Sequence, residues 1–160
     1  MKKLTVVTLT ALVVFFALPA RAGQMDWTMR LTLNHVATAD ADPAAKRKVG
    51  VMDISGPAEI EGRNAQAKVL VLYDYANGTG PWQVYMTLTL TDGSLTTYGS
   101  GLTVADENGL NSRFEGPLMV VAGTGRYANA RGSGTMSGQR AAKVGDDVQI
   151  DYEISLKVTE

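Results

Sequence analysis

The sequence predicts an all-β protein built as a single closed antiparallel β-barrel of about eight strands. Apolar and polar residues alternate with a period of two along most segments after residue 22, which is typical of strands with one buried face. Short turn sequences such as Asn77-Gly78 and Asn108-Gly109 separate these segments. No helical pattern is longer than the stretch 40–48, which has room for one helical turn. A sandwich would also fit, but short connections between neighbouring segments favour the barrel.

The first 22 residues have the composition of a secretory signal peptide. Two lysines precede an uncharged apolar run of about 15 residues, and the small-x-small sequence Ala20-Arg21-Ala22 follows. The run is short for a membrane-spanning helix, which needs about 20 residues. We therefore expect cleavage after Ala22, a mature barrel domain at 23–160, and secretion, most simply to a bacterial periplasm.

The expected mature chain is mildly acidic. Removal of Lys2, Lys3 and Arg21 leaves 12 basic residues against 16 acidic ones. Such a balance provides no basic surface for nucleic acid or anionic lipid. We expect no nucleic-acid partner, and no membrane association after signal cleavage.

Few residues could bind a metal. The chain has no cysteine, which excludes a lipoprotein anchor and disulfides, and its single histidine argues against a zinc or copper site. The acidic pairs lie in predicted loops without the spacing of calcium ligands; they are Asp40/Asp42, Asp106/Glu107 and Asp146/Asp147. The expected cofactor is therefore none.

The strands follow from the alternation, taken in chain order. The first places Trp27, Met29, Leu31, Leu33 and His35 on one face, and the last, at 148–158, alternates as regularly. Between them, strands are predicted at 49–56, 67–75, 81–90, 94–104, 112–122 and 131–139. Further turns are predicted at Asp92-Gly93 and Gly145-Asp146.

The stretch 123–128 has the form G-x-G-x-x-A of a dinucleotide-binding loop. Such a loop requires a helix directly after it, to bind the pyrophosphate at the helix N-terminus. Glycines at 132, 134 and 138 would each cost a helix about 1 kcal/mol relative to alanine. The sequence instead predicts a hairpin, in which Gly123 and Gly125 form the turn and the glycine face that begins at Gly132 accommodates a bulky neighbour such as Tyr127.

This hairpin sequence, "GTGRYANARGSGTMSG", resembles the signature hairpin of the allene oxide cyclase and dirigent barrel family. The stretches "WQVYMTLTLTDGSLTTYGSGLTV" and "VQIDYEISLKV" are similar to the central hairpin and closing strand of that family, so the resemblance spans residues 69–158. It implies an eight-stranded barrel with an apolar lumen, trimers as in plant members, and the steering of a reactive hydrophobic intermediate without a cofactor. The carboxylate and asparagine of the plant cyclases are matched only by Asn34, and Arg113 and Glu115 share a strand face without a secure counterpart.

Candidate ligand-binding residues come from aromatic side chains and from polar groups near them. They are Trp27, Asn34, His35, Tyr73, Tyr75, Trp82, Tyr98 and Arg113. The alternatives are that the aromatics form an ordinary core and that His35 lies at the barrel rim. The segment 69–75 is apolar on both faces because Leu70 and Leu72 point away from the core, which favours a homo-oligomer or a covering terminal segment.

The leading functional hypothesis is a secreted barrel that binds a small hydrophobic molecule in its lumen. One alternative is a dirigent- or cyclase-like enzyme that orients a reactive hydrophobic intermediate. Another is a structural or interaction module whose lumen is filled by its own side chains. The sequence names no catalytic residue and does not choose among the three.

Overall fold

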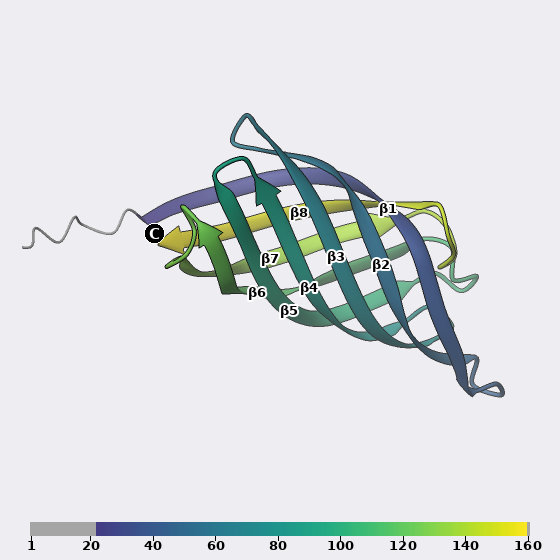
Figure 1. Cartoon of the computed structure of the whole chain (residues 1–160). Helices are drawn as coiled ribbons and strands as arrows, with labels where there is room; N and C mark the ends of the chain where they lie inside the picture. The colour runs from purple at the N-terminus through teal and green to yellow at the C-terminus, as the bar shows by residue number, and fades with distance from the viewer. Residues whose placement is uncertain (1–21, 160) are drawn as a thin grey trace, which may run out of the picture.

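Alternation of apolar and polar residues produces eight antiparallel strands that close into one barrel in the computed structural model, which describes residues 22–159 (Figure 1). The strands are β1 (Ala22–Asp42), β2 (Arg47–Ile60), β3 (Arg63–Ala76), β4 (Gly80–Leu90), β5 (Gly93–Ala105), β6 (Ser112–Gly125), β7 (Arg131–Arg140) and β8 (Val148–Thr159). Each strand pairs with the next, and β8 closes the barrel on β1. The predicted fold class is confirmed. The predicted signal peptide lies almost wholly in residues 1–21, outside the described part.

Two elements differ from the sequence prediction. The expected helical turn in 40–48 is instead the end of β1, a tight turn in which the Lys46 N–H donates to the Pro43 carbonyl at 3.2 Å, and the start of β2. The strand expected at 49–56 continues to Ile60, where Glu61 and Gly62 turn the chain with φ values of 52° and 74°. Two consecutive residues of positive φ are characteristic of the two-residue hairpin turn. In residues 22–159 no helix is long and apolar enough to cross a membrane.

The barrel interior combines bulky side chains with a stripe of inward-facing glycines. Trp82 on β4 is 4% exposed and packs against the backbone of β5 and β6. A Cβ at Gly101 would lie 2.4 Å from the Trp82 ring and one at Gly116 would lie 2.8 Å from it. Only glycine therefore leaves room for the indole at these two positions.

The end of the barrel that carries both described termini is closed by Tyr127 from the β6–β7 turn. Tyr127 is buried, and its hydroxyl accepts a 2.6 Å hydrogen bond from Arg63, which also pairs with Asp92 at 3.0 Å. The G-x-G-x-x-A stretch forms the end of β6 and this turn. Gly125 has φ 57°, whereas Gly123 is needed because a Cβ there would lie 2.0 Å from the Tyr127 carbonyl oxygen.

A β-bulge between Leu33 and His35 reverses the alternation of β1. The β7–β8 loop supports it: the Asp146 carboxylate accepts the Val36 N–H at 3.0 Å, and the Asp147 N–H donates to the Leu33 carbonyl at 2.7 Å. Beyond the bulge Val36 packs against the core and His35 is exposed.

Candidate ligand-binding site

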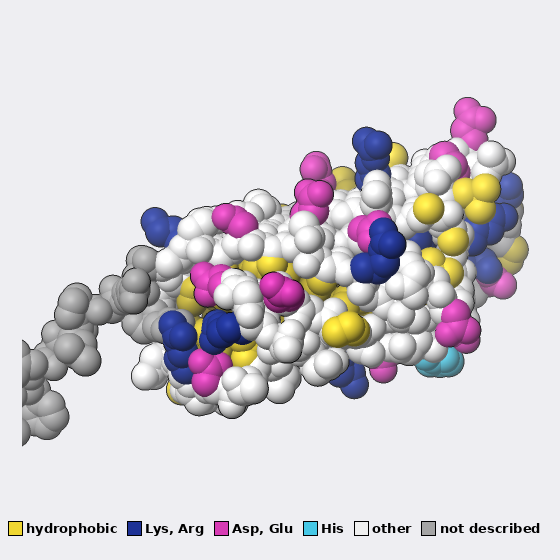
Figure 2. All heavy atoms as spheres, turned by 90° about the horizontal axis from the view of Figure 1, so that it is seen from above, with side chains coloured by type: hydrophobic (Ala, Val, Ile, Leu, Met, Phe, Trp, Pro, Cys, Tyr) yellow, Lys and Arg dark blue, Asp and Glu magenta, His cyan; other side chains and the backbone are white. Residues whose placement is uncertain are grey.

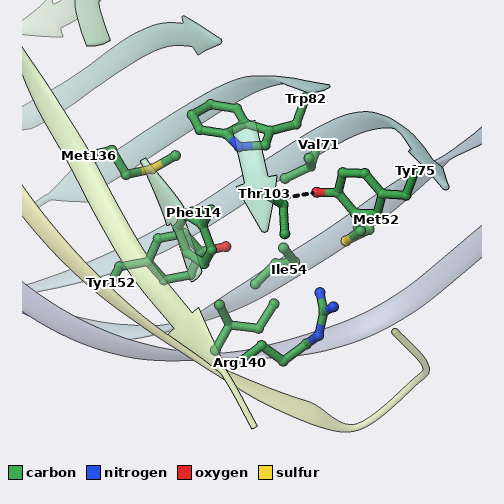
Figure 3. A pocket seen from close by; sticks show the side chains of 11 residues that line it. Met52, Ile54, Val71, Tyr75, Trp82, Thr103, Phe114, Met136, Arg140 and Tyr152 are labelled. Carbon is green, nitrogen blue, oxygen red and sulfur yellow. Dashed lines mark hydrogen bonds between the residues drawn. The ribbon is translucent and has the colours of Figure 1, made fainter. Parts of the chain in front are cut away.

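The barrel end opposite the termini is ringed by four connections, at 43–46, 77–79, 106–111 and 141–147 (Figure 1). They surround a cleft of about 320 Å³, the mouth cleft, whose floor is formed by Tyr73, Tyr75 and Arg140. Below it lies an inner cavity of about 30 Å³ inside the barrel, and Tyr75 and Arg140 line both spaces (Figure 3). The two spaces together form the candidate site.

Aromatic side chains from four strands, β3, β4, β6 and β8, line the inner cavity. The rings of Trp82 and Phe114 meet edge to face at 6.4 Å, and those of Phe114 and Tyr152 do so at 5.2 Å. The hydroxyl groups of Tyr75 and Thr103 form a 2.9 Å hydrogen bond, which is the dashed line in Figure 3. Met52, Ile54 and Met136 are among the remaining lining residues. The cavity wall is therefore largely apolar, with polar atoms at a few fixed points.

Arg140 is the charged group of the inner cavity. It ends β7, is 4% exposed, and extends its guanidinium toward Met52 and Tyr75 (Figure 3). Its Nε donates to the Ala142 carbonyl at 2.6 Å, but its Nη2 is buried and has no hydrogen-bond partner among the described residues. Burial lowers the pKa of Arg140, which nonetheless remains charged at neutral pH because an arginine titrates so far above it.

The other polar groups of the cavity are suited to donating hydrogen bonds. The indole Nε1 of Trp82 is buried and unpartnered among the described residues. Burial raises the pKa of both Tyr75 and Tyr152, so their phenols keep their protons at neutral pH. No Asp, Glu or His is among the residues that line the two spaces. The site can thus bind and orient an acceptor, but it has no carboxylate or imidazole base.

The mouth cleft adds positive charge. Lys46, Lys48 and Lys143 line it, and of these three Lys48 alone forms an ion pair within residues 22–159, with Asp40 at 3.8 Å. Figure 2 shows dark-blue lysine and arginine side chains at this end of the molecule, with magenta acidic side chains beside them. The charged side chains that line the cleft are thus all cationic, whereas the surrounding loops also carry acidic residues such as Glu107 and Asp146.

Three of the predicted ligand-binding residues meet at this site. Tyr73 and Tyr75 pack at 4.7 Å between ring centroids on the cleft floor, and Trp82 lines the inner cavity. Trp27 is buried in the barrel core but lines neither space. Trp27 is therefore an ordinary core residue, which was the alternative to a ligand-binding role.

The other four predicted residues lie outside the lumen. Asn34 lies on the outer face by alternation and donates to Ser55, whereas His35 is exposed because of the bulge in β1. Tyr98 faces outward and packs against exposed Tyr85 at 5.0 Å. Arg113 is exposed on the outer face of β6, so its alternating neighbours Ser112 and Phe114 point inward instead. These positions are corrections to the sequence prediction.

Sequence reasoning missed Arg140, Thr103, Phe114 and Tyr152. Arg140 lies one residue beyond the strand predicted at 131–139, and continuing the alternation from Met136 by two steps places it inward. The same alternation places Tyr152 on the apolar face of β8. Among residues 22–159, no group of three His, Cys, Asp or Glu side chains could hold a metal ion.

The closed barrel of eight sequentially paired antiparallel strands has a dirigent-like fold, as comparison with a solved structure shows. The solved structure of the pterocarpan synthase dirigent protein GePTS1 superimposes on it with a TM-score of 0.50, over 96% of this chain and 97% of that one, at 14% sequence identity. At this identity the likeness concerns the fold. No family model and no curated protein matches the sequence.

Proposed function

We propose that the protein binds a small hydrophobic molecule at the open end of its barrel, without a cofactor. The observation that carries the proposal is that an aromatic inner cavity adjoins a mouth cleft, with Tyr75 and Arg140 lining both. Concave, mostly apolar sites with a few fixed polar groups are the usual form of small-molecule sites.

The sizes of the two spaces determine where such a ligand lies. A cavity of about 30 Å³ accommodates only a group on the scale of one or two water molecules. The cleft of about 320 Å³ falls within the range of small-molecule sites, roughly 300–1,000 Å³. The body of the ligand therefore occupies the mouth cleft, and only one end of it enters the barrel. This placement differs from the sequence prediction, in which the ligand lies in the lumen.

Uptake of the neutral fluorescent dye N-phenyl-1-naphthylamine tests the proposal. The wild-type protein is expected to enhance its fluorescence with one saturable site. Asn108→Trp places a bulky ring in the cleft from an exposed loop position and is expected to weaken binding about tenfold or more. Asn64→Trp, exposed at the other end of the barrel, is the matched control and should bind like wild type. Equal binding by both variants, or none by wild type, contradicts the proposal; none by wild type favours a filled barrel.

A second candidate function is the orientation of a reactive hydrophobic intermediate, in the manner of a dirigent protein. The fixed donors Arg140 and Trp82, together with the absence of an acidic or imidazole group among the lining residues, favour orientation over proton transfer. Its test is product geometry: Trp82→Phe should change the ratio of products from a bound intermediate, and an unchanged ratio contradicts it.

We also propose that the mature protein is secreted and forms a homo-oligomer. The oligomer is supported by an outer apolar band, the exposed side chains on β2 to β6; they are Val49, Val51, Leu70, Leu72, Tyr85, Leu102, Val104, Met119 and Val121. Across the strands Val51 lies opposite Leu72, and Leu70 lies opposite Tyr85. Exposed apolar side chains that adjoin in this way are typical of an interaction surface.

A further inference from the structure

We propose that the ligand of the open end is an anion, whose negatively charged oxygen atoms bind the guanidinium of Arg140 while its apolar body lies in the mouth cleft. This inference rests on the proposed function and adds the chemical class of the ligand. A carboxylate and a sulfonate share the required chemistry, which is two or more acceptor oxygens that carry a negative charge.

The first step of the argument is the state of Arg140. The guanidinium has five N–H donors and no acceptor capacity. One donor is used by the Ala142 carbonyl, and Nη2 is buried without a partner among the described residues. An uncompensated buried charge is strongly unfavourable. A protein that needed only to hold the 141–147 loop could do so with a neutral donor, so the charge points to an anionic partner.

The second step is the sign of the surrounding charges. Lys46, Lys48 and Lys143 ring the entrance to the space that Arg140 reaches, and no acidic residue lines it. The acidic residues of the same barrel end lie outside this lining: Asp74 pairs with Arg47 and Asp40 with Lys48, and the carboxylates of Asp106 and Asp146 accept backbone N–H groups. Within the cleft an anion is therefore in contact with cationic side chains and with no acidic one, which favours its binding there.

The third step is the polarity of the uncharged groups. Trp82 Nε1 is a donor without a partner in the same cavity, and the phenols of Tyr75 and Tyr152 remain protonated. Donors converge on the cavity and no carboxylate competes for them. An oxygen-bearing anion at Arg140 satisfies the guanidinium, whereas a hydrocarbon leaves it unsatisfied, and Trp82 Nε1 is a further donor in the same cavity.

A matched pair of dyes tests the inference. 8-Anilinonaphthalene-1-sulfonate carries a sulfonate on the ring system that N-phenyl-1-naphthylamine presents without charge. We expect wild-type protein to bind the sulfonate at least tenfold more tightly than the neutral dye.

The variant Arg140→Met keeps the apolar volume of the side chain. It should lose the preference for the sulfonate but still bind the neutral dye. Its melting temperature should be at or above that of wild type, because a buried charge has been removed. Arg113→Met, on the outer face of the neighbouring strand, is the control and should leave both affinities unchanged.

The outcomes separate this inference from the proposed function. Binding of the neutral dye as tightly as the sulfonate overturns the anion inference and leaves the hydrophobic site standing. A parallel loss of both dyes in Arg140→Met, with a lowered melting temperature, assigns Arg140 a purely structural role and also overturns it. Sulfonate binding that survives in both Arg140→Met and Asn108→Trp places the dye on the outer apolar band and overturns it as well. Binding of neither dye by wild type contradicts both proposals.

Discussion

Charged residues at the open end differ in whether the protein itself compensates their charge. The carboxylate of Asp106 accepts N–H groups from Leu110 at 2.8 Å and Asn111 at 3.1 Å, which close the β5–β6 loop. Arg140 is 4% exposed, and its Nη2 has no hydrogen-bond acceptor among the described residues. The first pattern is that of a structural residue, and the second is that of a residue available to a ligand.

The Asp106 loop should make stability depend on pH. Backbone hydrogen bonds from Leu110 and Asn111 lower the pKa of Asp106. Because the folded pKa lies below the unfolded value of about 3.9, the stabilising effect is present above about pH 4 and is lost as pH falls through the folded pKa. Asp106→Asn should therefore lower the melting temperature at pH 7, and the difference from wild type should shrink below about pH 4. Thermal unfolding across this range measures it, and a difference that is constant with pH contradicts the assignment.

At the scale of the elements, the inward glycines of β5 and β6 set the position of Trp82. Gly116→Ala is expected to destabilise the protein by about 1–3 kcal/mol, as overpacking in a core does, because its Cβ would meet the Ser100 carbonyl at 2.2 Å and Trp82 at 2.8 Å. Gly145→Ala, with no atom within 4 Å of its Cβ, is the control and should change stability by less than about 0.5 kcal/mol. Urea unfolding measures both, and equal effects would refute the packing argument.

The elements also show where sequence reasoning succeeds and where it fails. Alternation and turn residues predict most strands, and three glycines at 132, 134 and 138 predict a strand rather than a helix at β7. The bulky neighbour of this glycine face is Phe114, which packs at Gly138, and not the predicted Tyr127, which packs at Gly123. The outward turn of His35 could not be predicted, since the bulge that causes it depends on Asp146 and Asp147, more than a hundred residues away. The positions of Tyr73, Tyr75 and Trp82 followed from local alternation. The place of Arg140 in the site could not be predicted in the same way, because the predicted strand ended at residue 139.

At the scale of the whole molecule, the outer apolar band should control assembly. Light scattering during gel filtration is expected to show a homo-oligomer for wild type and a monomer for Leu72→Glu, because a carboxylate at the centre of an apolar contact would be desolvated. Thr89→Glu, exposed near the opposite end of β4, is the control and should remain oligomeric. A monomeric wild-type protein contradicts the proposed oligomer and leaves the ligand site unaffected.

The closed barrel could be predicted as a whole because every segment carries the same alternation. How far side chains fill the lumen could not be predicted. Whether the lumen is open depends on how side chains from non-adjacent strands meet, as Phe114 does with Trp82 on one side and Tyr152 on the other. In the structure Tyr127 closes one end of the barrel, side chains fill the interior except for a cavity of about 30 Å³, and the mouth cleft lies at the other end.

The most direct test of the central claim, a small-molecule site at the open end, uses the two tryptophans as internal probes. Both indole N–H groups are buried without partners among the described residues, but only Trp82 lines the candidate site. In a proton–nitrogen correlation NMR spectrum, titration with 2-naphthoate should shift the Trp82 indole signal saturably and leave the Trp27 signal in place. Shifts confined to backbone amides of the outer apolar band, or equal shifts of both indoles, would contradict the account.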